Sequence, residues 1–130
     1  MKKVLVIDDA AELRRSVEKI LNHSGFLPLL APDGLSGVNV ARSELPDVIL
    51  CDVQMPNADG MTVYEHIRRQ QPYVLVKFVF VSGDILNRRL QTMVDSSQVP
   101  LLSKPFSADK LDVVLEQVAQ RSSQGQFSAH

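Results

Sequence analysis

The chain has 130 residues, of which 45% are hydrophobic and 22% are charged, as is usual for one soluble globular domain. Fourteen Lys and Arg against fifteen Asp and Glu give a formal net charge of −1, which argues against binding nucleic acid or an anionic membrane through a broad basic face. Cys51 is the only cysteine, so an intrachain disulfide and a zinc–thiolate cluster are excluded. No apolar run is long enough for a signal peptide or a membrane span, and we expect a cytoplasmic protein.

Short apolar runs alternate with stretches of helical periodicity along the chain. Runs without polar alternation predict strands that are buried on both faces, as in parallel sheets, at residues 4–7, 26–30, 48–51, 74–81 and 99–102. Apolar residues at helical spacing predict a helix after each strand, over about residues 13–21, 35–43, 63–67, 86–94 and 111–118. Gly25 fits the left-handed residue that ends the first helix, and Ser107 fits the N-cap of the last.

The alternation of strands and helices predicts an α/β fold with a flavodoxin-like, doubly wound parallel sheet of five strands and five helices. Proline is tolerated mainly at sheet edges, and only the second and fifth predicted strands contain one, Pro28 and Pro100. The order 2-1-3-4-5 puts these two strands at the edges. We expect the domain to span residues 1–120 and to be followed by a flexible tail or linker stub over 121–130.

Polar and charged side chains follow four of the predicted strands. Asp8 and Asp9 follow the first strand and Asp52 the third, while Ser82 follows the fourth and Lys104 the fifth. Ligands bind an open α/β sheet at the carboxyl ends of its strands, beside the point where the strand order reverses, which here lies between strands one and three. We therefore expect three carboxylates, a hydroxyl and an ammonium group at one edge of the sheet.

Three carboxylates close together repel one another unless one is protonated or a cation binds. Because the set offers oxygen ligands without His or Cys, it favours Mg²⁺ or a similar hard ion. A carboxylate, a divalent ion, a lysine and a hydroxyl are also the groups that phosphoryl transfer requires, so the residues predict an acidic site that accepts a phosphoryl group. The alternative is that each aspartate caps the helix after it, as Asp9 is placed to do, but this leaves the gathering of all three opposite Lys104 unexplained.

Over about residues 2–120 the chain resembles the receiver domain of bacterial two-component response regulators, of the CheY-like type. The resemblance rests on these motifs, in chain order: Asp8-Asp9, Asp52-Val53-Gln54-Met55-Pro56 with Gly60, Val81-Ser82-Gly83, and Lys104-Pro105-Phe106. It implies that Asp52 is the phosphoacceptor and receives its phosphoryl group from a phosphohistidine. It also implies that Asp9, Asp52 and the backbone carbonyl of Gln54 bind Mg²⁺ directly, while Asp8 binds it through water.

The resemblance assigns Lys104 and Ser82 to the phosphoryl group itself. Lys104 would pair with the phosphoryl oxygens, after a cis peptide bond to Pro105, and Ser82 would move to hydrogen-bond the new phosphate. The family carries Tyr or Phe three residues before this lysine, where the ring turns inward as the hydroxyl moves. This chain has Leu101 there, so the conformational switch is expected to work through other packing, or signalling is expected to rely on phosphate occupancy alone.

Gln54 and Asp84 lie two residues beyond Asp52 and Ser82, at positions that in the family flank the path of the attacking water. We expect them to modulate hydrolysis of the acyl phosphate. The alternative for Asp84 is a structural role as cap of the fourth helix.

The preferred function is a signalling switch, not a metabolic enzyme, that catalyses its own phosphorylation and dephosphorylation with Mg²⁺ as cofactor. It would alter partner binding through the face formed by the fourth helix, the fifth strand and the fifth helix. Two alternatives remain: a receiver-like protein-interaction module without phosphorylation, and a Mg²⁺-dependent aspartyl-phosphate phosphohydrolase. Enzymes of the latter kind carry Asp-x-Asp after the first strand, whereas this chain has the adjacent pair Asp8 and Asp9.

The expected partners are a sensor histidine kinase or a phosphotransfer protein, and a downstream protein or fused output domain. A homodimer is compatible with the sequence, whereas direct contact with nucleic acid or membrane is not expected.

Overall fold

The computed structural model describes residues 2–55, 59–70, 77–84 and 87–128, with 119–128 described by their backbone alone. Its five parallel strands run in the order β2-β1-β3-β4-β5, as the sequence predicts. The strands are β1 (Lys3–Ile7), β2 (Leu27–Ala31), β3 (Val48–Asp52), β4 (Phe78–Ser82) and β5 (Leu101–Ser103). Pro28 lies in the edge strand β2 and Pro100 directly precedes the edge strand β5, which confirms the argument from proline.

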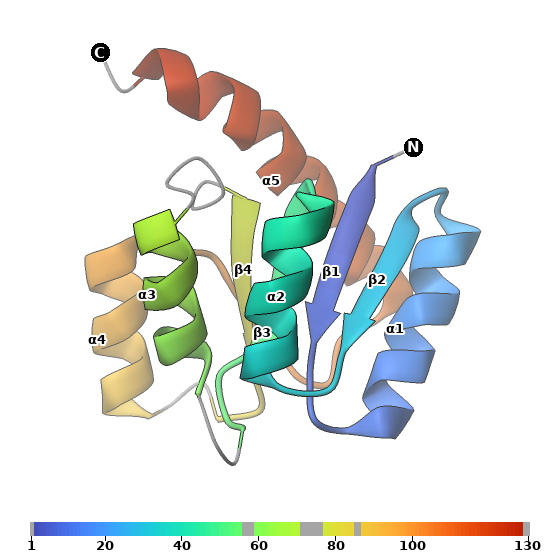
Figure 1. Cartoon of the computed structure of the whole chain (residues 1–130), viewed down its shortest axis with the longest axis horizontal. Coiled ribbons are helices and arrows are strands. Elements are labelled where there is room, and N and C mark those ends of the chain that lie inside the picture. Colours follow the sequence, from blue (N-terminus) through green and yellow to red (C-terminus); the bar gives the residue numbers. More distant parts are fainter. Residues whose placement is uncertain (1, 56–58, 71–76, 85–86, 129–130) are drawn as a thin grey trace.

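Helices cover both faces of the sheet (Figure 1). They are α1 (Ala11–His23), α2 (Gly34–Glu44), α3 (Gly60–Gln70), α4 (Arg88–Ser97) and α5 (Ala108–Ser128). One buried cluster joins the sheet to α2, α3 and α4 and includes a group of three edge-to-face rings, Tyr64, Phe78 and Phe80. The other cluster joins the opposite face to α1 and α5. Among the helices described, none is long and apolar enough to cross a membrane.

The predicted helix ends at Gly25 and Ser107 are confirmed. Gly25 has φ +87°, and the bond from the Phe26 amide to the Leu21 carbonyl closes the end of α1. The Ser107 hydroxyl accepts from the Lys110 amide at 3.1 Å in the first turn of α5. The predicted strand over 74–81 is found at Phe78–Ser82, and residues 74–76 lie outside the described residues, as does Leu86 of the predicted fourth helix.

The sequence places the end of the last helix near residue 120, whereas α5 continues to Ser128. Its backbone extends past the sheet in Figure 1. The apolar period does stop near residue 118, but a helix that is already nucleated and packed is easily extended by Gln, Arg and Ser. The loss of periodicity therefore marks where the packed face ends, not where the helix ends.

Candidate functional site

Strand register brings the predicted site residues to one edge of the sheet. Ile7 of β1 pairs with Cys51 of β3, so the residues that follow them, Asp8 and Asp52, lie side by side. Asp52 is the last residue of β3 and pairs with Val81, and Ser82 pairs with Ser103 on β5, directly before Lys104. The predicted site residues therefore gather because β1, β3, β4 and β5 all end at the same edge of the sheet.

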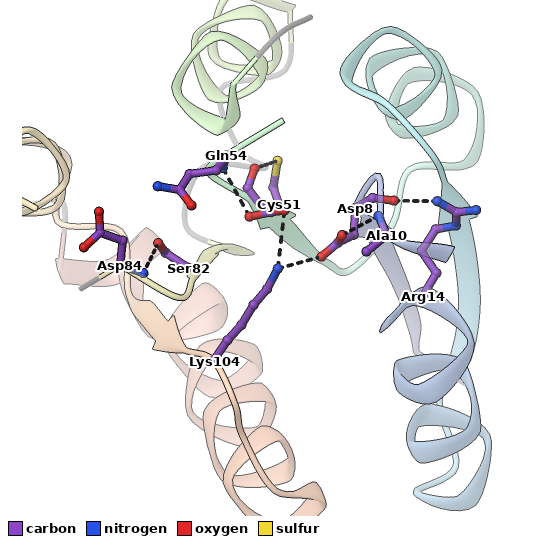
Figure 2. A network of polar contacts seen from close by, with 9 residues as sticks. Asp8, Ala10, Arg14, Cys51, Gln54, Ser82, Asp84 and Lys104 are labelled. Atoms are coloured by element: carbon purple, nitrogen blue, oxygen red, sulfur yellow. Dashed lines mark hydrogen bonds and ion pairs between the residues drawn. The ribbon is translucent and has the colours of Figure 1, made fainter. Parts of the chain in front are cut away.

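Lys104 bridges the two buried carboxylates (Figure 2). Its Nζ atom lies 3.2 Å from Asp8 Oδ2 and 3.3 Å from Asp52 Oδ2. Asp8 and Asp52 are 3% and 5% exposed, so each carboxylate has lost most of its hydration and gains from a charge-assisted partner. The peptide bond from Lys104 to Pro105 is cis, as the resemblance implies.

Three carboxylates form a cluster that fits a hard divalent cation. One oxygen from each of Asp8, Asp9 and Asp52 lies within 4.8 Å of the others. Asp9 is exposed while the other two are buried, so the cluster opens to solvent on one side. Oxygen donors of this kind, with room left for water, are what Mg²⁺ prefers. Asp9 does not cap α1, because the N-cap residue is Ala10, whose side chain makes no capping hydrogen bond.

Burial and the neighbouring groups together set the pKa of the Asp52 carboxyl group. Desolvation raises the pKa of its carboxyl group, and the neighbouring Asp8 charge raises it further, while Lys104 and the Gln54 amide lower it. The balance is a raised pKa, so the metal-free site is short of positive charge. Burial likewise raises the pKa of the Cys51 thiol well above its usual value, which keeps this residue a small apolar component of β3.

Ser82 is fully buried, and its Oγ accepts a hydrogen bond from the Asp84 amide at 3.0 Å. The hydroxyl proton is thus available to another acceptor at the site. The capping role considered for Asp84 falls to Asn87, whose side chain accepts from the Leu90 amide at 3.2 Å. The Asp84 carboxylate instead lies 3.5 Å from the Asn87 side-chain amide.

Gln54 and Leu101 take the positions that the sequence predicts. The Gln54 amide donates to Asp52 Oδ1 at 3.2 Å, so this backbone segment curls around the carboxylate. Leu101 pairs with Phe80 of β4 and packs against the cluster formed with α2, α3 and α4. A groove of about 480 Å³ between α4 and the start of α3 borders Gln54 and Ser82, which leaves the site open on that side.

Sequence reasoning missed the role of Arg14 and the reason for Gly60. The guanidinium of Arg14 donates to the Asp8 carbonyl at 2.7 Å. A Cβ atom on Gly60 would lie 2.8 Å from the Asp52 carbonyl oxygen, so only glycine fits there without a shift of the backbone. The only signal for Arg14 was a basic residue in the helix that follows an acidic pair, which is too common to single it out.

Comparison with known families settles what kind of domain this is. The model of the response regulator receiver domain matches residues 4–116. The chain belongs to this family. The receiver fold and the family resemblance that the sequence motifs indicate are therefore confirmed.

Individual relatives agree with this assignment. The chain is 31% identical to the probable transcriptional regulator ycf27 of Guillardia theta, over 99% of this chain and 50% of that protein. It is 29% identical to the sensor histidine kinase CheAY of Helicobacter pylori, over 87% of this chain and 14% of that protein. The chemotaxis protein CheY4 of Vibrio cholerae superposes with a TM-score of 0.83 at 27% identity, over 91% of this chain and 98% of that one. The chain thus spans half the length, or less, of these two sequence relatives.

Proposed function

We propose that Asp52 accepts a phosphoryl group from a phosphohistidine and that the chain thereby works as a signalling switch. The observation that supports this most is the position of the Asp52 carboxylate. It is buried beside Asp8, held by Lys104 and bonded to the amide of Gln54, a residue that lines the same groove as Ser82. A nucleophile, an ammonium group and a hydroxyl within one water-poor site are what phosphoryl transfer asks of a protein.

In the proposed reaction a carboxylate oxygen of Asp52 attacks phosphorus. The new P–O bond forms as the P–N bond to the donor imidazole breaks, and the imidazole nitrogen keeps the electron pair. Lys104 offsets the negative charge on the phosphoryl oxygens, and the Ser82 hydroxyl donates a hydrogen bond to one of them. Hydrolysis by water later returns the free carboxylate, and the side chains of Gln54 and Asp84 are proposed to modulate this step.

The residues that would hold Mg²⁺ are Asp8, Asp9, Asp52 and the backbone carbonyl of Gln54. When bound, the ion would neutralise the carboxylates and the phosphoryl oxygens. Among the three aspartates Asp9 is the exposed one, so it is the carboxylate that an incoming ion meets first.

The domain is proposed to span residues 1–120, with 121–130 as a tail or linker stub whose backbone continues helix α5 up to Ser128. The proposed partners are a histidine kinase or phosphotransfer protein and an output partner or fused output domain, contacted through α4, β5 and α5. A location in the cytoplasm stays a prediction. With Leu101 at the switch position, the output signal would depend on the packing of α4 or on phosphate occupancy.

Intact mass spectrometry after incubation with Mg²⁺ and a small acyl-phosphate donor tests the proposal. Wild type should gain one phosphoryl group, and Asp52→Asn, as well as wild type with a chelator, should gain none. Asp95→Asn, at an exposed carboxylate of α4, is the matched control and should still be phosphorylated. No gain in wild type, with Mg²⁺ binding shown separately by calorimetry, would contradict the proposal and favour an interaction module without phosphorylation.

A further inference from the structure

Every backbone and side-chain polar atom of Asp8 has a partner. Its amide donates to the Ala31 carbonyl at 3.1 Å, and its Oδ1 accepts from the Ala10 amide at 2.9 Å. Its Oδ2 pairs with Lys104 at 3.2 Å. The remaining atom, the carbonyl oxygen, accepts from Arg14 Nη1 at 2.7 Å, the shortest of these bonds. Asp8 is therefore fixed from four directions, and Arg14 supplies the one that comes from α1.

Helix α1 begins after Ala10 without a side-chain cap, and Arg14 ties the first turn of the helix to the preceding loop. The Arg14 amide bonds to the Ala10 carbonyl at 3.0 Å, while its guanidinium reaches back to the Asp8 carbonyl (Figure 2). The first turn of α1 is thus closed onto the loop that carries the acidic pair. Arg14 is partly buried, so its hydrogen bond is shielded from competing water.

Asp9 lies between the two residues held in this way. Its side chain is exposed, yet one of its carboxylate oxygens stays within 4.8 Å of oxygens of Asp8 and Asp52. Among the described residues, no hydrogen bond or ion pair reaches the Asp9 carboxylate, so its position follows from the backbone on either side. That backbone is set by the bonds of Asp8 to Ala10 and to Arg14.

We propose that Arg14 is a positioning residue for the cation site: it holds the loop of Asp8 and Asp9 so that the Asp9 carboxylate is in place before Mg²⁺ binds. This inference rests on the proposed function. Holding a ligand in its bound position lowers the ordering entropy that binding must overcome. A planar, permanently charged guanidinium suits the task because its donors keep a fixed direction.

A simple charge effect would have the opposite sign, which makes the inference testable. A positive charge beside the cluster repels a cation, so removing it would tighten Mg²⁺ binding if charge alone mattered. Arg14→Lys keeps the charge but loses the planar donor. Arg14→Gln removes the charge and is too short to span the same distance. Arg15→Lys, at the exposed next position of α1, is the matched control.

The test uses isothermal titration calorimetry for the Mg²⁺ Kd and NMR water-exchange rates for the Ala10 amide in the metal-free protein. Arg14→Lys should weaken Mg²⁺ binding roughly tenfold, as loss of a supporting contact does at metal sites, and should speed exchange at Ala10. Arg14→Gln should also weaken binding in spite of its lost charge. Arg15→Lys should match wild type in both measurements.

Unchanged Kd and Ala10 exchange in Arg14→Lys would overturn the inference, and so would tighter binding in Arg14→Gln. If Arg14→Lys does not fold, the direction in which Arg14→Gln changes the Mg²⁺ Kd decides between positioning and a simple charge effect. A wild-type chain that binds no Mg²⁺ and takes up no phosphoryl group would overturn the proposed function instead. In that case the Ala10 exchange rates of the metal-free variants would still report whether Arg14 holds the loop.

Discussion

The Lys104 ammonium lies 3.3 Å from the Asp52 carboxylate, yet the pKa of Asp52 remains raised. The first cause is burial, which desolvates the carboxylate, and the second is the charge of Asp8, which is also buried and shares Lys104 with Asp52. One positive charge between two desolvated carboxylates leaves the metal-free site with an excess of negative charge. The site is thus built at a cost in stability, and neutralising it should stabilise the fold.

Asp52→Asn should therefore stabilise the metal-free protein at neutral pH. A carboxyl group whose pKa is higher in the folded than in the unfolded chain opposes folding once it is ionised, and this penalty is complete above the folded pKa. The penalty fades as the pH falls and the group takes up a proton. We expect Tm to rise by roughly 3–6 °C at pH 7.5 in a chelator, about what 1 kcal/mol gives a domain of this size. The difference should shrink as the pH falls toward about 4, the ordinary pKa of an aspartate.

Thermal unfolding followed by circular dichroism between about pH 4 and pH 7.5 measures this difference. Asp47→Asn, which alters the carboxylate that accepts from the Lys3 amide at the other end of the sheet, controls for a general effect of removing charge. A gap between wild type and Asp52→Asn that is the same at every pH would contradict the argument, as would a less stable variant.

Much of this site could be predicted from the sequence because residue types and strand ends determined it. Buried apolar runs that stop at Asp8 and Asp52 fix where the carboxylates lie once the strands are in register. The contact from Arg14 to the Asp8 carbonyl could not be predicted in the same way, since it depends on the conformation of one long side chain. The need for glycine at position 60 depends on the distance between the start of α3 and the end of β3, for which a sequence holds no periodic signal.

Mg²⁺ should stabilise the fold through Asp9. At a Mg²⁺ concentration of 100 times the Kd, binding adds about 2.7 kcal/mol to the free energy of unfolding, and a chelator removes it. Asp9→Ala should lose most of this gain, but in the chelator its stability should stay within about 0.5 kcal/mol of wild type because the side chain is exposed. Urea unfolding with and without Mg²⁺ gives both numbers.

Glu12→Ala is the control for Asp9→Ala, because Glu12 is an exposed carboxylate in the first turn of α1 that lies outside the cluster. It should keep the full Mg²⁺ effect. An equal gain from Mg²⁺ in Asp9→Ala and wild type would exclude Asp9 as a ligand.

Gly60→Ala should destabilise the fold and displace Asp52, the proposed phosphoacceptor. The added Cβ would lie 2.8 Å from the Asp52 carbonyl oxygen and 2.9 Å from the Val53 Cα, and both are backbone atoms that cannot rotate away. We expect a loss of about 1–3 kcal/mol, although alanine is the better helix former. Gly83→Ala is the control, since its Cβ would meet only the Lys104 Cβ at 4.0 Å, an ordinary contact. Equal stability of the two variants by urea unfolding would show that the backbone around Asp52 and Val53 shifts at no cost in stability.

Leu45→Gly should stabilise the protein, against the usual trend for glycine. Leu45 ends α2 with φ 49°, in the left-handed region where a Cβ costs roughly 1 kcal/mol, and its side chain is 62% exposed, so little burial is lost. Part of the gain is offset because glycine makes the unfolded chain more flexible, which leaves about 0.5 kcal/mol. Leu35→Gly, at an equally exposed leucine inside α2, should instead cost about 0.5–1 kcal/mol. Chemical unfolding of the two variants checks the sign of each stability change. A loss of stability in both would show that the Leu45 side chain makes stabilising contacts in spite of its exposure.

Asp84→Ala should alter how long the phosphorylated state lasts more than how fast it forms. The Asp84 amide, which the substitution keeps, bonds to the Ser82 hydroxyl, whereas the carboxylate that it removes is exposed beside the site. Since α4 is capped by Asn87, loss of the Asp84 carboxylate leaves the helix in place. We expect a change of about threefold or more in the hydrolysis rate, within the range that a group assisting proton transfer contributes. Loss of phosphorylated protein followed by intact mass, with Asp95→Ala on the exposed face of α4 as control, measures it. Equal lifetimes for Asp84→Ala, Asp95→Ala and wild type would leave Asp84 without a part in hydrolysis and put the control of lifetime on Gln54.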